Sequence, residues 1–180
     1  MVTNRHVGDP GFADGAVNEP PLDQLPDIQV HFVLGTKAEG KVVWLAPHGI
    51  DLALVRVEGE IEEARTAQWE TNRPVHVGDQ VVAIGSPLRL GWTVTQGVVS
   101  QLRRQHIHEK VVRIIQTQTA LTPGNSGGGL FDRDGFLVGV NTWTNDRRIS
   151  EGLGFAISLD ALLELRPPGL RPPGPNGEKP

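Results

Sequence analysis

The most specific stretch of this chain is PGNSGGGLF, residues 123–131. It places Ser126 in a glycine-rich turn that opens into a strand. A serine hydroxyl is a weak nucleophile at neutral pH, and it needs a base to take its proton and fixed donors to receive the developing negative charge. Glycines on both sides let the backbone turn tightly and point successive N–H groups at one spot. The turn therefore predicts a nucleophilic Ser126, with a base and an orienting group elsewhere in the chain.

Two stretches upstream of the turn supply those groups. His6 lies in TNRHV, residues 3–7, and Asp51 opens the alternating stretch DLALVRV, residues 51–57. The chain order is therefore His, Asp, Ser. This is the order of the chymotrypsin triad, in which the aspartate orients a histidine that serves as general base for the serine.

Two other hydrolase classes fit this order poorly. Residues 124–128 match the G-x-S-x-G turn of α/β-hydrolases, but those enzymes place their histidine after the serine. All six histidines of this chain precede Ser126, which excludes that class. The subtilisin order of Asp, His and Ser would need Asp9 or Asp27, and neither lies in a supporting motif.

The chain resembles trypsin-like serine proteases of the HtrA/DegP type. Six motifs of that family occur in order over about 155 residues, and together they are more specific than any one of them. They are TNRHV (3–7), DLAL (51–54), VGDQVVAIGSP (77–87), TVTQGVVS (93–100), QT with PGNSGG (116–117 and 123–128), and GLGFAI (152–157).

The resemblance implies a role for each member of the triad. Ser126 is the nucleophile that forms an acyl-enzyme, His6 is the general base, and Asp51 holds the tautomer of His6 and stabilises its charged form. The backbone N–H groups of Gly124 and Ser126 form the oxyanion hole, where the loss of one donor typically costs about 3 kcal/mol of transition-state stabilisation. No cofactor is implied.

The resemblance also implies how a polypeptide substrate binds. An extended segment would add as a strand along Val140, Asn141, Thr142 and Trp143, with Trp143 either walling the cleft or packing as an ordinary strand residue. Leu121 matches the position that lines the primary specificity pocket. No acidic residue stands at a matching position, so we expect a small or medium aliphatic residue before the scissile bond.

We expect an all-β fold of two antiparallel barrels of the trypsin-like type, with the first barrel incomplete, plus a short C-terminal helix. The peptidase domain spans residues 1–165, with the first barrel over about 1–75 and the second over about 76–157. Alternation and Gly/Pro punctuation predict the strands. They are 28–34, 41–46, 51–57, 79–85, 92–102, 111–118, 128–132, 136–143 and 153–157.

Local signals sharpen the second half. Asp134-Gly135 predicts a hairpin turn. Ser158 is placed to cap a helix over 159–165 whose leucines form one apolar face. Residues 166–180 contain two copies of Arg-Pro-Pro-Gly and predict a disordered or polyproline-type tail. Trp44, Trp69 and Trp92 are expected to be packing residues.

Composition limits the partners. The net charge is −4 with no long basic run, which argues against nucleic acid, and no apolar run reaches the roughly 20 residues needed to span a bilayer. The chain has no cysteine, so disulfides contribute nothing. Residues 8–27 are acidic and proline-rich and predict a solvated loop, in preference to a calcium site from Asp9, Asp14 and Glu19. Likewise, His106 and His108 favour a charged hairpin loop over half a metal site.

The chain departs from the family pattern in several places. Gly129 stands where the family has Pro, Gln118 where it has Asp and Thr119 where it has Ala. Met1 lies close before His6, so we expect the first barrel to lack opening strands that relatives possess. This leaves an alternative open, a catalytically inactive remnant that binds extended peptides along residues 140–143. A tail that recruits partners through Arg-Pro-Pro-Gly is a third hypothesis. The family also implies an extracytoplasmic compartment, and oligomeric state is not predicted.

Overall fold

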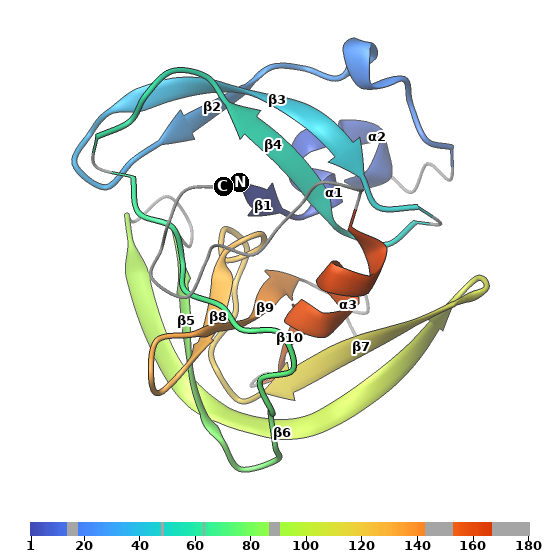
Figure 1. The fold of residues 1–180 in the computed structure, drawn as a ribbon, viewed down its shortest axis with the longest axis vertical. Coiled ribbons are helices and arrows are strands. Elements are labelled where there is room, and N and C mark those ends of the chain that lie inside the picture. Colours follow the sequence, from blue (N-terminus) through green and yellow to red (C-terminus); the bar gives the residue numbers. More distant parts are fainter. Residues whose placement is uncertain (14–17, 48, 63, 87–90, 143–152, 167–180) are drawn as a thin grey trace. The chain divides into compact units, whose positions relative to one another are not determined.

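The chain forms two compact units, Met1–Arg65 and Thr66–Pro180 (Figure 1). The computed structural model describes residues 1–13, 18–47, 49–62, 64–86, 91–142 and 153–166. Within those ranges, no helix is long and apolar enough to cross a membrane. The division precedes the expected boundary near residue 75, because Gln68 bridges to Phe136 of the second unit.

Strands dominate both units. In chain order the elements are β1 (Val2–Thr3), α1 (Arg5–Gly8), α2 (Pro10–Ala13), the short 3-10 helix η1 (Leu22–Gln24), β2 (Ile28–His31), β3 (Lys37–Leu45), β4 (Ala53–Val57), β5 (Gln80–Gly85), β6 (Thr93–Ile107), β7 (Lys110–Thr117), β8 (Gly129–Asp132), β9 (Leu137–Thr142), β10 (Gly154–Ser158) and α3 (Leu159–Leu165). Each stretch predicted as a strand overlaps one of these strands.

The first unit is built on an open antiparallel sheet with strand order β1-β4-β3-β2. Residues on β3 alternate between exposed and buried along most of the strand, so one face can pack inward. A register shift between Val42 and Trp44 bends β3 where it pairs with β4. Buried Val42, Leu45, Ala53 and Val55 form the core of this unit. The expected incomplete first barrel is confirmed as this four-stranded sheet.

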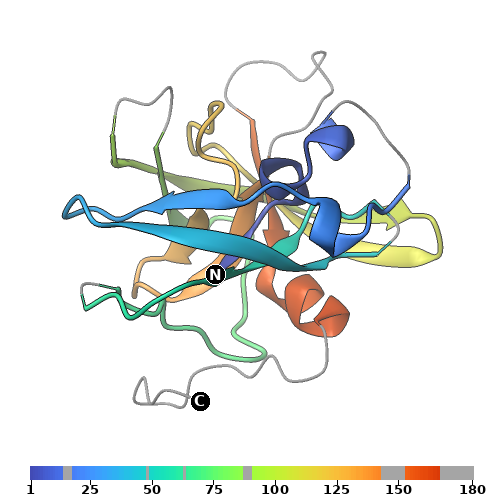
Figure 2. The same ribbon diagram turned by 90° about the horizontal axis from the view of Figure 1, so that it is seen from above.

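The second unit is a closed barrel with strand order β10-β7-β6-β5-β8-β9 (Figures 1 and 2). Every strand pair is antiparallel, and closure leaves no edge strand among the described residues of the barrel. Its interior is filled by apolar side chains from each strand of the barrel. They are Val81, Ala83, Val99, Ile115, Leu130, Val138 and Ala156. The predicted second barrel is confirmed.

Strand ends differ from the predictions where both faces carry the same kind of residue. β6 extends to Ile107, beyond the predicted end at 102. The prediction ended early because residues 101–106 are exposed on both faces and show no apolar alternation. β6 and β7 form a hairpin whose last pair is Ile107 with Lys110, so His106 and His108 lie on a hairpin as predicted. Among the described residues, no group of three His, Cys, Asp or Glu side chains is placed to hold a metal ion.

The predicted turn and helix cap are both present. Gly135 has φ +84°, and its N–H donates to the carbonyl of Asp132 at 3.1 Å in the β8–β9 hairpin. The Ser158 hydroxyl accepts from the N–H of Ala161 at 3.3 Å and caps α3 over its predicted range. The tail from residue 167 onward lies outside the described residues, so its disorder stays a prediction.

One of the packing tryptophans was predicted wrongly. Trp44 and Trp69 are partly buried, but Trp92 is 57% exposed. Trp92 lies just before β6 and two residues from the exposed Val94, and residues two apart point to the same side of an extended chain. Size and hydrophobicity alone therefore gave the wrong environment for Trp92.

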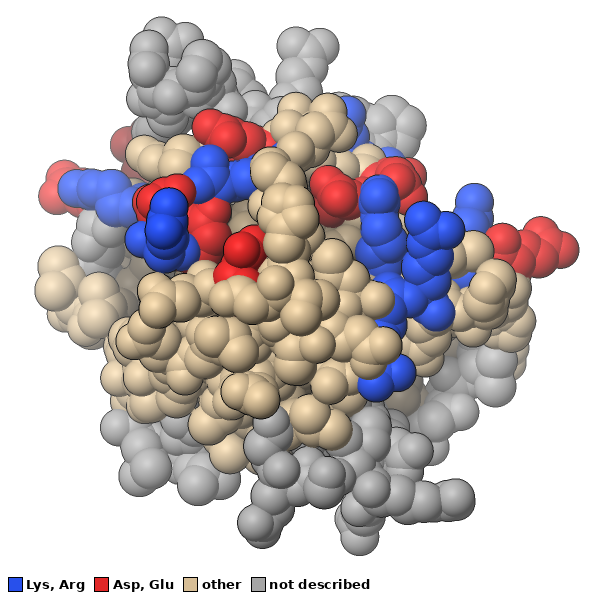
Figure 3. All heavy atoms as spheres, turned by 90° about the horizontal axis from the view of Figure 1, so that it is seen from below, with Lys and Arg blue, Asp and Glu red and all other residues tan. Residues whose placement is uncertain are grey.

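Charge is spread over the surface. On the face drawn in Figure 3, basic and acidic side chains lie among one another. In the second unit, the Arg73 guanidinium forms ion pairs with Glu70, Asp132 and Asp134 and stacks 4.0 Å from the ring centre of Phe136. The hydrogen bond to Asp132 raises the pKa of Arg73. This cluster fastens the start of the second unit to the β8–β9 hairpin.

We expect Leu130→Ala to lower the free energy of unfolding by about 2–5 kcal/mol, because Leu130 is fully buried in the barrel core and its loss leaves a cavity. The matched control is Leu34→Ala, since Leu34 is 77% exposed and its truncation should change stability by less than about 0.5 kcal/mol. Urea unfolding of both variants measures the difference. Equal losses would contradict the assigned barrel core.

Candidate active site

His6 and Asp51 meet inside the first unit. The Nδ1 atom of His6 lies 2.9 Å from Oδ2 and 3.0 Å from Oδ1 of Asp51. The two side chains are 29% and 17% exposed, so the pair is shielded yet open to a reactant. When Nδ1–H donates to the carboxylate, Nε2 is left as the acceptor, which is the form a general base needs. The structure thus brings two of the predicted residues together.

The chain around His6 holds this pair through its backbone as well. The N–H of His6 donates to Oδ1 of Asp51 at 3.0 Å. The side chain of Asn4, itself fully buried, donates from Nδ2 to the carbonyl of Asp51 at 2.8 Å. Three groups of the T-N-x-H stretch, one on Asn4 and two on His6, therefore fix the aspartate.

A buried ion pair next to His6 escaped the sequence analysis. Arg5 is 0% exposed and Asp9 is 3% exposed, and Nε of Arg5 lies 2.9 Å from Oδ2 of Asp9. The prediction of a solvated loop from residue 8 is wrong at Asp9, because Asp9 is the buried partner of a cation. The available signal was the spacing of Arg and Asp, four residues apart around the histidine.

The same contact bears on the calcium alternative. The carboxylate of Asp9 is occupied by Arg5 and by the N–H of Phe12, which donates to Oδ1 at 3.3 Å. Asp14 lies outside the described residues, and Glu19 is engaged in an interaction of its own. The observed role of Asp9 is therefore to pair with a buried cation.

Ser126 sits in a turn of the second unit that is closed by its own backbone. The N–H of Asn125 donates to the carbonyl of Thr122 at 3.0 Å, and the N–H of Gly128 donates to the carbonyl of Asn125 at 3.1 Å. Gly124 has φ +101° and Gly127 has φ +81°, in the region that favours glycine. The side chain of Ser126 is half-buried at the apex of this turn.

The turn lies very close to the end of β5. A Cβ atom at Gly128 would overlap the carbonyl oxygen of Ile84, and one at Gly85 would lie 2.8 Å from Cα of Asn125. In addition, the N–H of Ser86 donates to the carbonyl of Gly124 at 3.1 Å. Two of these glycines are therefore required by close approach, independently of the positive φ angles at Gly124 and Gly127.

The two N–H groups proposed as oxyanion donors differ in their hydrogen bonding from those of the neighbouring residues. The N–H groups of Asn125, Gly127 and Gly128 all donate within the protein. Among the hydrogen bonds of the described residues, the N–H groups of Gly124 and Ser126 have no acceptor. Two unspent donors beside the serine hydroxyl are what an oxyanion hole requires, provided they point at one spot.

In the strand predicted to bind substrate, part of the backbone is already hydrogen-bonded within the protein. Val140 and Asn141 are 3% and 0% exposed. The backbone of Asn141 accepts from Gly127 at 2.9 Å and donates to Gly128 at 2.8 Å. Its N–H and C=O are therefore spent on holding the serine turn. Val140 and Thr142 pair with β10, and Thr142 is half-buried with a further interaction. Trp143 lies outside the described residues.

Leu121 is half-buried and packs against the barrel core. Its Cδ1 atom would lie 2.8 Å from a Cβ atom placed at Gly154, so Gly154 leaves room for this leucine. Thr119 is fully buried, and its hydroxyl lies 2.7 Å from that of Thr117. The departure from the family pattern at Thr119 is thus matched by a hydrogen-bonding partner, whereas Gln118 is exposed.

The departure at Gly129 also has a local reason. A Cβ atom at Gly129 would lie 2.5 Å from the ring of Phe131 and 2.9 Å from Cδ1 of Leu137. These two side chains fill the space that a larger residue would need. A larger residue at this position would therefore require both side chains to shift.

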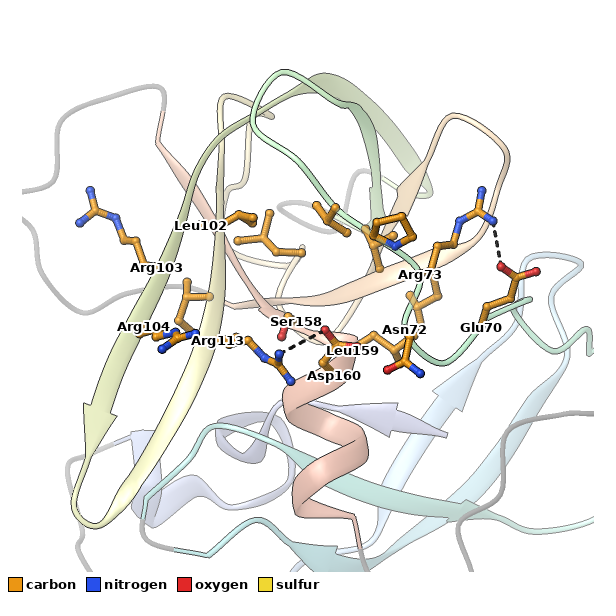
Figure 4. Close-up of a pocket in the computed structure, with 16 residues that line it drawn as sticks. Glu70, Asn72, Arg73, Leu102, Arg103, Arg104, Arg113, Ser158, Leu159 and Asp160 are labelled. Atoms are coloured by element: carbon orange, nitrogen blue, oxygen red, sulfur yellow. Dashed lines mark hydrogen bonds and ion pairs between the residues drawn. The ribbon is translucent and has the colours of Figure 1, made fainter.

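A separate cavity of about 340 Å³ lies in the second unit. In Figure 4, residues from β6, β7, the segment before β5 and the start of α3 surround it, with ion pairs between Arg113 and Asp160 and between Arg73 and Glu70. None of the predicted site residues lines this cavity. The residues of the predicted triad lie outside this cavity, with His6 and Asp51 in the first unit and Ser126 in the second.

Comparison with known proteins gives a consistent picture. Residues 1–140 match the family model of the trypsin-like peptidase domain. The chain is 38% identical over 175 residues to Protease Do-like 5, chloroplastic, from Arabidopsis thaliana, covering 93% of this chain and 52% of that protein. It is 36% identical over 169 residues to the periplasmic serine endoprotease DegP of Salmonella typhimurium, covering 92% and 32%.

Solved structures agree. The HtrA-type protease AlgW with decapeptide matches with a TM-score of 0.69 at 32% identity, over 91% of this chain and 46% of that chain. The serine endoprotease from Yersinia pestis matches with a TM-score of 0.66 at 31% identity, over 91% and 50%. The chain therefore spans about half, or less, of the proteins it resembles here.

The close approach of the serine turn to β5 predicts a strong effect of one methyl group. We expect Gly128→Ala to destabilise the second unit by about 3 kcal/mol, the upper end of the usual range for overpacking, because the methyl group would overlap the carbonyl of Ile84. Gly135→Ala is the matched control, since it faces open space and carries only the strain of φ +84°, about 1–2 kcal/mol. Urea unfolding measures both, and similar losses would contradict the tight turn.

Proposed function

The chain belongs to the trypsin-like peptidase family, and we propose that it is a serine endopeptidase of the HtrA type. It would hydrolyse peptide bonds in extended or unfolded protein segments through an acyl-enzyme on Ser126. The observation that carries the proposal is the contact of Nδ1 of His6 with both oxygens of Asp51, at 2.9 and 3.0 Å. An imidazole held in this way is prepared to act as a base at its other nitrogen.

The chemistry follows from the roles of the three residues. His6 takes the hydroxyl proton of Ser126 at Nε2 while the serine oxygen attacks the carbonyl carbon of the peptide. The resulting oxyanion is stabilised by the N–H groups of Gly124 and Ser126. His6 then gives its proton to the leaving amine, and the C–N bond breaks to leave an ester on Ser126. Water, deprotonated by the same imidazole, hydrolyses that ester and restores the hydroxyl.

Asp51 contributes by holding the ring and by stabilising its positive charge. It accepts a hydrogen bond from Nδ1–H throughout, and it stays a carboxylate when Nε2 becomes protonated. Because the side chain of Asp51 is only 17% exposed, water weakens its attraction to the charged imidazole less than it would at the surface. No step of this mechanism calls for a cofactor.

Substrates are proposed to be extended polypeptides. A solved relative is described as bound to a decapeptide. Because the backbone of Asn141 is already bonded to the serine turn and Thr142 pairs with β10, we place the main-chain contacts with substrate beyond Thr142, towards Trp143. Leu121 is proposed to line the pocket for the residue before the scissile bond. Relatives named as periplasmic or chloroplastic support an extracytoplasmic location.

Active-site labelling with a fluorophosphonate probe tests the activity. We expect the folded chain to be labelled, and Ser126→Ala and His6→Ala to abolish labelling. Asp51→Asn should slow it by about 10⁴-fold, since the wrong tautomer of His6 is then held. His31→Ala is the matched control, because His31 is exposed on the edge strand β2.

Two results would reject the activity. A folded wild-type chain that resists the probe would favour the inactive remnant that only binds peptides. Labelling that survives in Ser126→Ala would place the nucleophile elsewhere. Turnover of unfolded casein by the wild-type chain, lost in Ser126→Ala, then distinguishes a protease from a chain that merely reacts with the probe.

Cleavage of a peptide library tests the specificity pocket. We expect small or medium aliphatic residues before the scissile bond, because the half-buried Leu121 offers an apolar surface and no charge. Leu121→Ala should shift the preference towards larger side chains by about tenfold, the usual effect of a methylene or two in an apolar pocket. A profile dominated by Arg or Lys would contradict this assignment.

A further inference from the structure

The buried ion pair of Arg5 and Asp9 flanks His6 and has no part in the reaction steps above. Besides its contact with Asp9, the guanidinium donates from Nη2 to the carbonyl of Asn18 at 3.2 Å. It also lies 4.7 Å from the ring centre of Phe12. Arg5 therefore joins four points of the chain, from α1 through α2 to the segment that follows.

The pair is poorly explained as a source of stability. Removing two charges from water costs more than their attraction returns unless every polar atom is satisfied. Here the Nη1 atom of Arg5 is buried and has no hydrogen-bond partner among the described residues. The cation also precedes the anion, which is the weaker order for an i,i+4 pair at a helix, and Asp9 already lies just after α1. A packed apolar pair would hold the fold at least as well.

The pair of Arg5 and Asp9 is well placed to fix the direction in which the imidazole of His6 points. α1 is a single turn of four residues, too short to keep its shape by its own hydrogen bonds. Arg5 and Asp9 bracket that turn, and the N–H of Asp9 donates to the carbonyl of Arg5 at 2.8 Å. His6 lies between them. Any rotation of the turn that moves the imidazole must therefore stretch a buried, charge-assisted contact.

The cluster also reaches the strand-entry loop that carries Asp51. A Cβ atom at Gly49 would touch the ring of Phe12 at 4.0 Å, so the ring under Arg5 lies beside the loop just before Asp51. On the other side, a Cβ atom at Gly8 would lie 2.7 Å from Cγ2 of Val42, which shows how closely α1 is pressed onto β3. One cluster thus supports both members of the His–Asp pair.

We propose that Arg5 and Asp9 are positioning residues, which hold the turn of His6 so that its imidazole keeps both contacts with Asp51. The inference rests on the proposed function, because a general base displaced by about 1 Å can lose a hundredfold in rate. Both side chains are buried, so neither offers a surface to substrate. Their contribution is the orientation of His6, and it is separable from their contribution to stability.

The test uses variants that remove the pair without leaving a lone buried charge. Arg5→Met combined with Asp9→Leu replaces both partners by apolar side chains, a change that buried ion pairs often tolerate. The control is Lys41→Met combined with Glu58→Leu, which removes an ion pair of 3.7 Å whose side chains are 50% and 46% exposed in the same unit. Each is compared with the wild-type chain for melting temperature and labelling rate with the fluorophosphonate probe.

A second readout is independent of any activity. Nitrogen-15 NMR of the imidazole of His6, recorded in the Ser126→Ala background, reports which ring nitrogen carries the proton. We expect the wild-type pair to keep the proton on Nδ1. The double variant at positions 5 and 9 should show a mixture of the two tautomers, and the control double variant should match the wild type.

The outcomes separate the two proposals. We expect labelling to fall by about 10- to 100-fold in the folded double variant, with the tautomer mixture, and to be unchanged in the control. A folded double variant with the wild-type rate and the wild-type tautomer overturns the inference. If the wild-type chain is not labelled, the proposed function fails, and the tautomer readout alone decides the role of the pair.

Asp9→Glu covers the case in which the double variant does not fold. It keeps both charges and moves the carboxylate by one methylene, so stability should change little while the turn of His6 shifts. We expect labelling to drop several-fold and the Nδ1 tautomer to lose its dominance. A wild-type labelling rate and tautomer in folded Asp9→Glu overturns the inference. Arg5→Lys keeps the charge but not the planar fork, so it should retain more of the labelling rate than the double variant does.

Discussion

The backbone of Asn141 ties the serine turn to the barrel, and most features of the second unit that concern the site depend on this tie. The backbone C=O of Asn141 accepts a hydrogen bond from Gly127, and its N–H donates one to Gly128, the two glycines that follow Ser126. The turn can lie that close only because Gly128 has no side chain to strike β5. The position of the nucleophile is therefore set by the hydrogen-bond ladder of a closed sheet, which is one of the stiffest frames a protein offers. Closure of the barrel also means that no strand beside the turn has a free edge to slip along.

The histidine half is held by different means. Its helix is one turn long and its sheet is open, so regular secondary structure contributes little to the direction of the imidazole. Side chains take over that task, with Asn4 and the N–H of His6 holding Asp51 from one side and a buried Arg–Asp pair bracketing the turn from the other. The two halves illustrate two ways of placing a reactive group, a backbone ladder in one and a side-chain network in the other.

Sequence reasoning predicted the elements whose burial alternates, and it failed where environment depends on distant partners. The strands of the barrel, the Asp134-Gly135 turn and the Ser158 cap all carry local signals, and each was found in its expected place. The sequence did not predict the end of β6, because the last residues of this strand are exposed on both faces. Asp9 reads as a solvated acid until the cation that buries it is known. For Asn141, the sequence indicates a strand but not which neighbour uses its backbone, and that neighbour is the serine turn itself.

The open sheet of the first unit has a consequence for the lifetime of the protein. The endopeptidase activity that we propose, on extended segments, would also meet such segments in neighbouring copies of the same chain. The barrel offers none among its described residues, because every strand there has two neighbours. In the described part of the first unit, by contrast, β2 pairs with β3 on one side only, and it carries the half-buried aliphatic residues Ile28 and Val30. We expect self-digestion at high protein concentration to begin near this edge, so that autolysis would inactivate the protein by loosening the histidine unit while the barrel stays intact.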